Sequence, residues 1–357
     1  MTTRLTWTHQ PYNAIWDHIL FLSSKANVKK LLVGQTLSNR AQTQIFTDNE
    51  LVEKKSTQIA YSISQAREYY YAADAVSVAT SPLLYFYGML SLAKALIVAN
   101  DPNLLLDEIK YHGLSSRPIP EDSSCHSDNG DVLTLEDECA VVKPGVFLHL
   151  ARLTQGIEIP ENHVYCMRQL FSVNPELADS YVRSYGISSQ VQYLYDHQEI
   201  YEPYRLTLCP RTIDKTSFER LFPELPNDFA CEEAVRHNQA LVYQSKSTIT
   251  EFPRYIGIYS PLPGGRYLVR GLDYQSNGAI IVQYTFPELC DYIFMFILSN
   301  CVRYKQEFWG KVIRGEESGS IGIMNQAISI ARLRFPNFVL SQFYNESFVY
   351  GTTARWQ

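Results

Sequence analysis

The sequence has little that would suit a secreted or membrane-spanning protein. Its seven cysteines are scattered and odd in number, and none forms a Cys-x-x-Cys pair, so neither a disulfide framework nor a zinc site is predicted. The longest apolar run, residues 292–298, is far too short to cross a bilayer, and the N-terminus has no hydrophobic signal segment. We therefore expect a cytoplasmic protein that makes no contact with membranes.

The sequence also lacks the short motifs of common enzyme classes. It has no Gly-x-Ser-x-Gly, no His-Glu-x-x-His and no kinase signature. Residues 263–266, Pro-Gly-Gly-Arg, are not a phosphate loop, because no Lys-Ser/Thr and no helix follow them. The net charge of -6 gives no general basic surface for duplex DNA. From these absences we predict no metal and no cofactor, and we assign no catalytic residue.

Hydrophobic residues make up 46% of the chain, and it has 25 tyrosines, which excludes disorder over most of its length. The organising stretch is residues 58–117. Apolar positions spaced four, three, four and three residues apart predict a helix with one buried face: Ile59, Ile63, Ala66, Tyr70 and Ala73. A second helix, apolar nearly all round and therefore buried, follows Ser81-Pro82 and stops at Asn100-Asp101-Pro102.

Three parts are predicted around this helix pair. Residues 1–120 form an N-terminal helical part that includes the pair, with a polar, loop-rich segment at 36–56. Residues 121–285 form a mixed α/β middle, in which three β-rich segments predict an antiparallel meander within residues 254–285. Residues 286–357 form helices that pack back on the N-terminal part.

Helix signals place the boundaries of these late helices. Thr285 and Glu288 form a capping-box pattern, which starts a long apolar helix. That helix is expected to break near Lys305 and to end at Gly315. Another helix is predicted to stop at Phe335-Pro336, because the residue before a proline disfavours the helical conformation.

Two blocks of sequence carry a family resemblance. One is PLLYFYGMLSLAKALIVANDP, which starts at Pro82, followed by YHGLSSR, which starts at Tyr111. The other is YIFMFILSNCVRYKQEFWGKV, which starts at Tyr292 and precedes the Phe335-Pro336 stop. In these blocks the chain resembles the YaaC-like family of bacterial proteins. The resemblance implies an architecture and no particular activity.

The helix pair also resembles the core hairpin of HEPN-type helical domains, which occur in toxin–antitoxin and phage-defence proteins, often as dimers. This likeness implies a mainly α (α+β) fold, in which N- and C-terminal helices form a HEPN-like bundle with a small antiparallel β insert. HEPN ribonucleases carry an Arg followed, four to six residues later, by a His on a late helix. Only Arg4 and His9 have that spacing, in a stretch without helical period, so chance spacing is favoured over nuclease chemistry.

Candidate ligand-binding residues gather at two places. After the helix pair, Gly113 can turn the chain so that His112 and Arg117 converge on a phosphate or carboxylate; the alternative is a structural turn whose His caps a helix. On the late helix, Arg303 and Tyr304 would contact an anion beside an aromatic face; the alternative is a buried, paired Arg.

Lys94 and Arg67 are further candidates, although Lys94 also suits a lysine that snorkels to a helix end. A nucleotide or RNA end becomes the expected ligand if these cations face one cavity. The consecutive Tyr69, Tyr70 and Tyr71 cannot all point inward, so together with Trp309 they are candidate interface residues for a homodimer or a partner protein.

The absence of a catalytic signature favours a non-catalytic binding or regulatory module, in stress response or phage defence. One alternative is a metal-independent enzyme that cleaves RNA or nucleotides through His112, Arg117 and Arg303. Another is a structural subunit of a larger complex.

Overall fold

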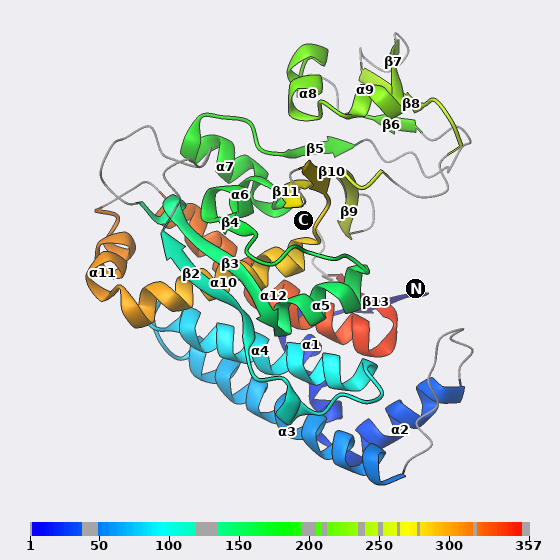
Figure 1. Cartoon of the computed structure of the whole chain (residues 1–357), viewed down its shortest axis with the longest axis vertical. Coiled ribbons are helices and arrows are strands. Elements are labelled where there is room, and N and C mark those ends of the chain that lie inside the picture. The colour runs from blue at the N-terminus through cyan, green and yellow to red at the C-terminus, as the bar shows by residue number, and fades with distance from the viewer. Residues whose placement is uncertain are drawn as a thin grey trace. The chain divides into compact units, whose positions relative to one another are not determined.

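The computed structural model describes residues 2–37, 49–118, 134–194, 205–208, 213–234, 240–248, 253–262, 265–276, 279–316 and 320–351. The fold is mainly helical with several small sheets (Figure 1). The chain divides into two compact units. Unit 1 comprises Met1–Met167 and Glu288–Gln357, and unit 2 comprises Arg168–Pro287.

Unit 1 contains long helices from both ends of the chain. They are α1 (Pro11–Leu20), α2 (Lys25–Leu37), α3 (Asn49–Asp74), α4 (Ser81–Asn100), α5 (Val146–Gln155), α10 (Pro287–Tyr304), α11 (Gln306–Arg314) and α12 (Ile321–Tyr344). Its strands are β1 (Thr2–Trp7), β2 (His112–Pro118), β3 (Glu138–Gly145), β4 (Val164–Cys166) and β13 (Glu346–Gly351). Strands β1 and β13 pair in parallel, and β2, β3 and β4 form an antiparallel sheet.

Helices α3 and α4 lie side by side and form the centre of unit 1 (Figure 1). The predicted face of α3 is buried, with Ile59, Ile63, Ala66 and Tyr70 at most 1% exposed. Gly88 of α4 lets the helices approach closely, because a Cβ there would lie 2.5 Å from the Tyr70 ring. The small residue and the large ring are therefore matched across the helix pair.

Gly88→Ala is expected to lower the free energy of unfolding by about 1–3 kcal/mol, because the added methyl overlaps a fully buried ring. Gly34 in α2 is the matched control, since an added Cβ there meets nothing within 4 Å. Gly34→Ala is expected to stabilise by up to about 1 kcal/mol through helix propensity. Urea unfolding of both variants measures the difference, and equal effects at the two positions would contradict the close approach.

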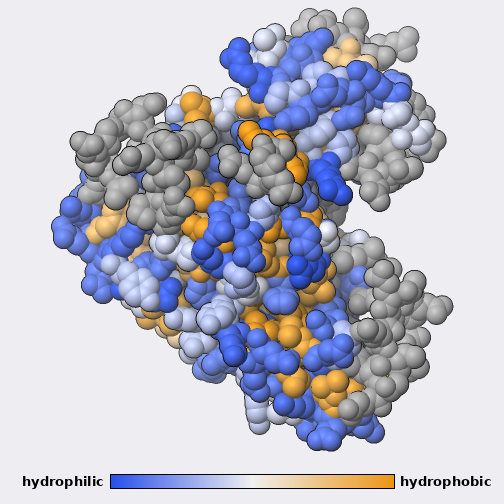
Figure 2. Space-filling model, in the orientation of Figure 1, coloured by the Kyte–Doolittle hydropathy of each residue, from blue (hydrophilic) through white to orange (hydrophobic). Residues whose placement is uncertain are grey.

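Judged by length and composition alone, helix α4 is apolar enough to cross a membrane. However, 72% of the apolar 18-residue stretch within it is buried inside the structure. A core helix passes the same test. Its neighbours include α3, α5 and α12. On the face shown in Figure 2, hydrophilic residues cover most of the coloured surface and hydrophobic residues show in smaller groups between them.

The late helices share the interior of the N-terminal helix pair. The Tyr292 hydroxyl of α10 donates to the carbonyl oxygen of His112 at 3.0 Å, and the Trp309 indole of α11 donates to Ala79 O at 3.1 Å. Within the bundle, Arg334 of α12 and Asp291 of α10 form a buried two-bond ion pair, at 2.8 and 2.7 Å. Segments 180 and 230 residues apart in sequence are thus joined by specific polar contacts.

A buried lysine from α3 caps the C-terminal end of α4. Lys55 of α3 is 0% exposed, and its ammonium donates to the carbonyls of Val98 (3.1 Å), Asp101 (2.5 Å) and Leu104 (2.7 Å). These are carbonyls at and beyond the helix end, which have no partner inside the helix. The sequence placed Lys55 in a loop-rich segment, and that was wrong, because α3 already begins at Asn49.

Several predicted boundaries are confirmed and others are wrong. Helix α4 ends at Asn100, and Lys305 separates α10 from α11, both as predicted. The stop at Phe335-Pro336 is wrong, because α12 runs through Pro336, which packs in the buried interior. The His-Gly turn is instead the start of strand β2, where Gly113 has a φ of +85° at a register shift against β3.

Unit 2 is a mixture of short helices and antiparallel strands. Its helices are α6 (Met167–Ser172), α7 (Ala178–Tyr185), α8 (Lys215–Leu221) and α9 (Leu225–Asp228). Its strands are β5 (Val191–Leu194), β6 (Arg205–Thr207), β7 (Phe229–Ala234), β8 (Ala240–Ser245), β9 (Ile256–Leu262), β10 (Gly265–Arg270), β11 (Leu272–Ser276) and β12 (Ala279–Gln283). Residues such as Phe218, Phe222 and Tyr243 form its core.

The predicted meander of residues 254–285 is divided between two sheets. One sheet has the order β5-β10-β9 and the other pairs β11 with β12. The predicted strand at residues 266–272 ends at Arg270, and β11 begins at Leu272. Between them the chain passes Gly271 in close backbone contact, where a Cβ would lie 2.5 Å from the carbonyl carbon of Gln283. The antiparallel pairing of β9 with β10 follows the predicted meander, and the pairing of β10 with β5 does not.

Candidate functional site

Three basic side chains from separate elements come together in unit 1. They are Lys94 of α4, His112 of β2 and Arg303 of α10, which we call the basic cluster. Burial lowers the pKa of His112, and the positive charges of Arg303 and Lys94 lower it further. Burial also lowers the pKa of Lys94. Two cations thus lie close enough to a partly buried imidazole to disfavour its protonated form, and protonation of His112 costs free energy unless something offsets these charges.

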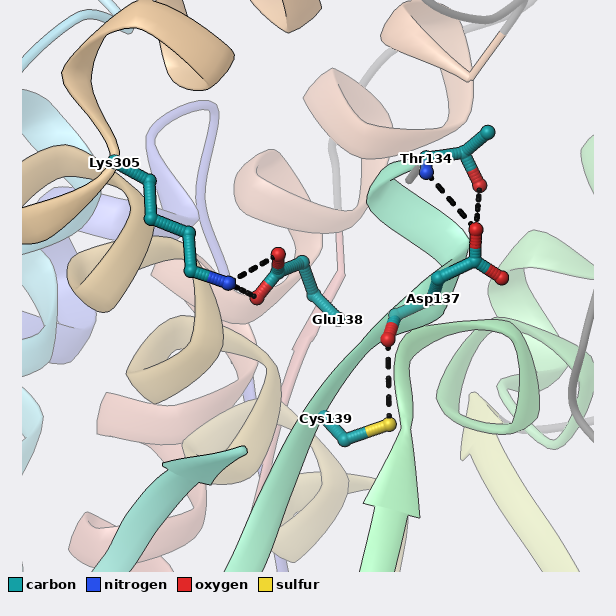
Figure 3. A network of polar contacts seen from close by, with 5 residues as sticks. All are labelled: Thr134, Asp137, Glu138, Cys139 and Lys305. Atoms are coloured by element: carbon teal, nitrogen blue, oxygen red, sulfur yellow. Dashed lines mark hydrogen bonds and ion pairs between the residues drawn. The ribbon is translucent and has the colours of Figure 1, made fainter. Parts of the chain in front are cut away.

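No acidic side chain among the described residues offsets these charges. The Arg303 guanidinium donates to Ser299 O at 3.3 Å and to the Tyr87 hydroxyl at 3.5 Å. Nearby Lys305 shows the contrast, since its ammonium is held by both oxygens of buried Glu138 at 2.5 and 2.7 Å (Figure 3). The basic cluster is therefore a place where an anion from outside the described chain would be stabilised.

Two tyrosine rings lie next to Arg303 of the basic cluster, and a third stacks on one of them. The Arg303 guanidinium carbon lies 4.9 Å from the ring centre of Tyr304 and 6.0 Å from that of Tyr87. The Tyr87 ring stacks on Tyr69 of α3 at 5.6 Å. We call Tyr69, Tyr87, Arg303 and Tyr304 the tyrosine–arginine stack. Its Tyr304 end is 72% exposed, so a planar group could lie against that ring.

The fold fixes His112 from several sides. Phe86 and Phe296 place their rings 6.1 and 5.1 Å from the imidazole, while Tyr292 holds its backbone carbonyl. The Leu114 N–H donates to Nδ1 at 3.3 Å. Nδ1 therefore carries no proton in the neutral ring, and the proton resides on Nε2. The imidazole is thus arranged as a hydrogen-bond donor.

Comparison with known proteins shows the family. A family model described as YaaC-like Protein matches residues 20–343. The chain belongs to the YaaC-like family. The match covers all three members of the basic cluster, and no curated protein and no solved structure matches the chain. The family match therefore assigns no activity to this YaaC-like chain.

The two other ligand candidates of the YaaC-like chain are Arg67 and Arg117. Arg67 has its guanidinium over the rings of Trp16 and Tyr71, at 5.2 and 5.6 Å. Arg117 is in β2, opposite Cys139 of β3. The sequence grouped Arg117 with His112 in one turn, whereas the structure puts them at different positions of a strand.

The four aromatic interface candidates differ in exposure. Tyr70 is 0% exposed and Trp309 is 3% exposed, so both belong to the interior of unit 1. Tyr69 is partly buried against Tyr87, and Tyr71 is 65% exposed. Of the three consecutive tyrosines, then, Tyr71 is the one that faces outward.

A second polar site in unit 1 was missed by sequence reasoning. Asp74 accepts hydrogen bonds from Tyr12 (2.9 Å) and Tyr85 (2.7 Å) and pairs with Arg332 at 2.7 Å. A hollow of about 310 Å³ adjoins it, lined among others by Val78, Tyr85 and Arg332. Because the Asp74 charge already meets a cation and two hydroxyls, this network is balanced without a ligand.

The basic cluster is the stronger candidate because its charges are unbalanced among the described residues. The part of the chain that the structure describes holds no group of three His, Cys, Asp or Glu side chains that would suit a metal ion. Tyr87 is the site residue that sequence reasoning missed, because the second helix was read only as apolar nearly all round. Tyr87 lies two turns before Lys94 on the same face of α4, and this spacing could have identified it as a neighbour of Lys94.

Proposed function

We propose that this YaaC-like protein is a non-catalytic binding module whose ligand is a nucleotide. The observation that supports it is the basic cluster, where the positive charges of Lys94 and Arg303 disfavour protonation of His112 and no acidic neighbour among the described residues offsets them. A phosphate group between them would accept hydrogen bonds from all three. Its negative charge would also offset the effect of the two cations on His112.

The base of the nucleotide is assigned to the tyrosine–arginine stack. Tyr304 exposes most of its ring and lies next to the guanidinium that would hold the phosphate. Stacking of a base on an aromatic ring stabilises binding by about 1–3 kcal/mol and tolerates different bases. The proposal therefore concerns nucleotides as a class.

Two probes separate the phosphate from the base. ATP carries both, and inorganic tripolyphosphate carries the phosphates alone. Tyr304→Ala is expected to weaken ATP binding by about 5- to 100-fold through lost stacking, and to leave tripolyphosphate binding within about twofold. Isothermal titration calorimetry with EDTA present measures both. Equal loss for the two probes would contradict base stacking, and no binding of either would contradict the proposed function.

Metal-independent cleavage of RNA or nucleotides by a HEPN-like bundle is the competing function. It would use His112, Arg117 and Arg303. The Leu114 N–H donates to Nδ1 of His112, so the neutral imidazole would offer its proton from Nε2. Incubation with total RNA and labelled nucleotides, with and without EDTA, tests it. Turnover that His112→Ala abolishes would replace the binding module with this enzyme.

The roles in stress response or phage defence, a cytoplasmic location and a homodimer stay proposals that rest on the same reasoning. Tyr71 is the outward-facing aromatic that a partner would meet in the structural-subunit alternative. Light scattering decides the dimer, because a mass equal to one chain would contradict it.

A further inference from the structure

Two cysteines of unit 1 face each other across neighbouring strands. Cys139 of β3 is paired in register with Cys166 of antiparallel β4. Their sulfur atoms are 3.1 Å apart, and the residues are 1% and 2% exposed. Neither forms a disulfide in the structure. This pair takes no part in the nucleotide site proposed above.

The backbone around the pair already has the geometry of a disulfide. Residues directly opposite in antiparallel strands have Cα atoms about 4.5–5.5 Å apart, inside the usual disulfide range of about 4.4–6.8 Å. Closing the bond requires the sulfurs to approach by only about 1 Å. No shift of strand register is needed, which distinguishes these thiols from two cysteines that merely occur in one domain.

The strand that carries Cys139 is held firmly by the residues just before it (Figure 3). Asp137 accepts hydrogen bonds from the Thr134 N–H at 2.9 Å and hydroxyl at 2.8 Å, and its carbonyl lies 3.4 Å from the Cys139 sulfur. Glu138 binds Lys305. The thiol is therefore fixed opposite its partner.

We propose that Cys139 and Cys166 are a redox pair that closes to an intramolecular disulfide when a small hydroperoxide oxidises them. The thiolate of one cysteine attacks a peroxide oxygen, which breaks the O–O bond, releases water from hydrogen peroxide and leaves a sulfenic acid. The second thiol then forms the S–S bond and displaces the hydroxyl as a second water. Two electrons pass from the sulfurs to the peroxide, and two thiols with one peroxide give one disulfide and two waters.

The disulfide would join β4 covalently to β3, near the end of the first of the two chain segments that form unit 1. Cys166 directly precedes Met167, the last residue before unit 2 begins at Arg168. The bond would close the loop from Cys139 to Cys166, which restricts the unfolded chain. Oxidation is therefore expected to raise the Tm by about 5–10 °C, reversibly with dithiothreitol.

The test oxidises the full chain with hydrogen peroxide, blocks remaining thiols with N-ethylmaleimide and maps tryptic peptides by mass spectrometry. Trypsin leaves Cys125 and Cys139 on one peptide, because no Lys or Arg lies between them. A Cys125→Ser background therefore identifies the partner. Cys290 is an internal control, since it is as buried as the pair, at 2% exposed, but lies in helix α10 rather than opposite another cysteine across two paired strands.

The expected result is a cross-link between the Cys139 and Cys166 peptides that survives Cys125→Ser, disappears in Cys139→Ser and returns to two thiols on reduction. Cys290 is expected to stay unoxidised in the same sample. Modification of Cys139 and Cys166 as separate thiols, or a cross-link that persists in Cys139→Ser, would overturn the proposal. Because the Cys125→Ser protein keeps both members of the pair, the test does not depend on the folding of Cys139→Ser.

Discussion

Replacing Arg334 with methionine is expected to lower the free energy of unfolding by about 3–5 kcal/mol. Arg334 and Asp291 are buried, and two hydrogen bonds join the guanidinium to the carboxylate between α12 and α10. The variant keeps most of the side-chain volume and removes only the positive charge and its donors. Asp291 is then left as a buried charge without this cation, and an uncompensated buried charge is strongly destabilising.

Two controls separate the lost pair from lost packing. The double variant Arg334→Met with Asp291→Leu removes both charges and is expected to recover most of the stability. Arg314→Met removes a cation that pairs with Glu316 on the surface, where both side chains are at least half exposed, and should change little. Urea unfolding of the four proteins gives the comparison. A double variant that is less stable than Arg334→Met would show that loss of the cation beside Asp291 is not the cause.

The second large effect is on ligand binding. Lys94→Gln and Arg303→Gln are each expected to weaken tripolyphosphate binding by about 10- to 100-fold, because each removes a charge-assisted hydrogen bond worth about 1.5–3 kcal/mol. Together they remove two of the three cations of the basic cluster. Raising the salt concentration should narrow the difference between the unaltered protein and the variants only partly, because salt screens buried charges weakly.

Lys54→Gln is the matched control for these variants. It lies on α3 in the same unit, makes the same change in net charge, and is exposed. Its tripolyphosphate affinity is expected to stay within about twofold of that of the unaltered protein, since surface charges interact weakly at a distance. If Lys54→Gln weakens binding as much as Lys94→Gln, then net charge rather than the basic cluster determines affinity.

Much of the helical architecture could be predicted because its signals are local. The buried face of α3 follows from spacing, and the end of α4 follows from Asn100-Asp101-Pro102. The interruption of α12 predicted at Pro336 failed because packing of a buried helix outweighs a single missing hydrogen bond. Strand pairing was predicted only in part. Strands β9 and β10 pair antiparallel as expected, whereas the other partner of β10 is β5, which lies more than 60 residues earlier.

The sequence predicted which residues could bind an anion, but it did not predict which of them would lie together in the fold. Lys94 and Arg303 stood out as basic residues in apolar helices, and His112 stood out in the polar group that runs from it to Arg117. Nothing in their spacing shows that β2 runs beside α10, because that proximity comes from the tertiary fold. Arg67 had the same local appearance and instead stacks on Trp16. The cysteine pair was passed over because cross-strand register is invisible without the sheet.

The central claim is that an anion binds among Lys94, His112 and Arg303, and the pKa of His112 reports on it most directly. In the free protein, burial and the two neighbouring cations hold this pKa below 6.5. A bound phosphate favours the protonated imidazole, so the pKa must rise on binding, and affinity must strengthen as the pH falls through that range. NMR titration of the histidine ring resonances, with His112→Gln for assignment, measures the value with and without tripolyphosphate. We predict a pKa below 6.5 that moves upward with saturating tripolyphosphate, whereas an unmoved His112 pKa in protein shown to have bound the probe would contradict the account.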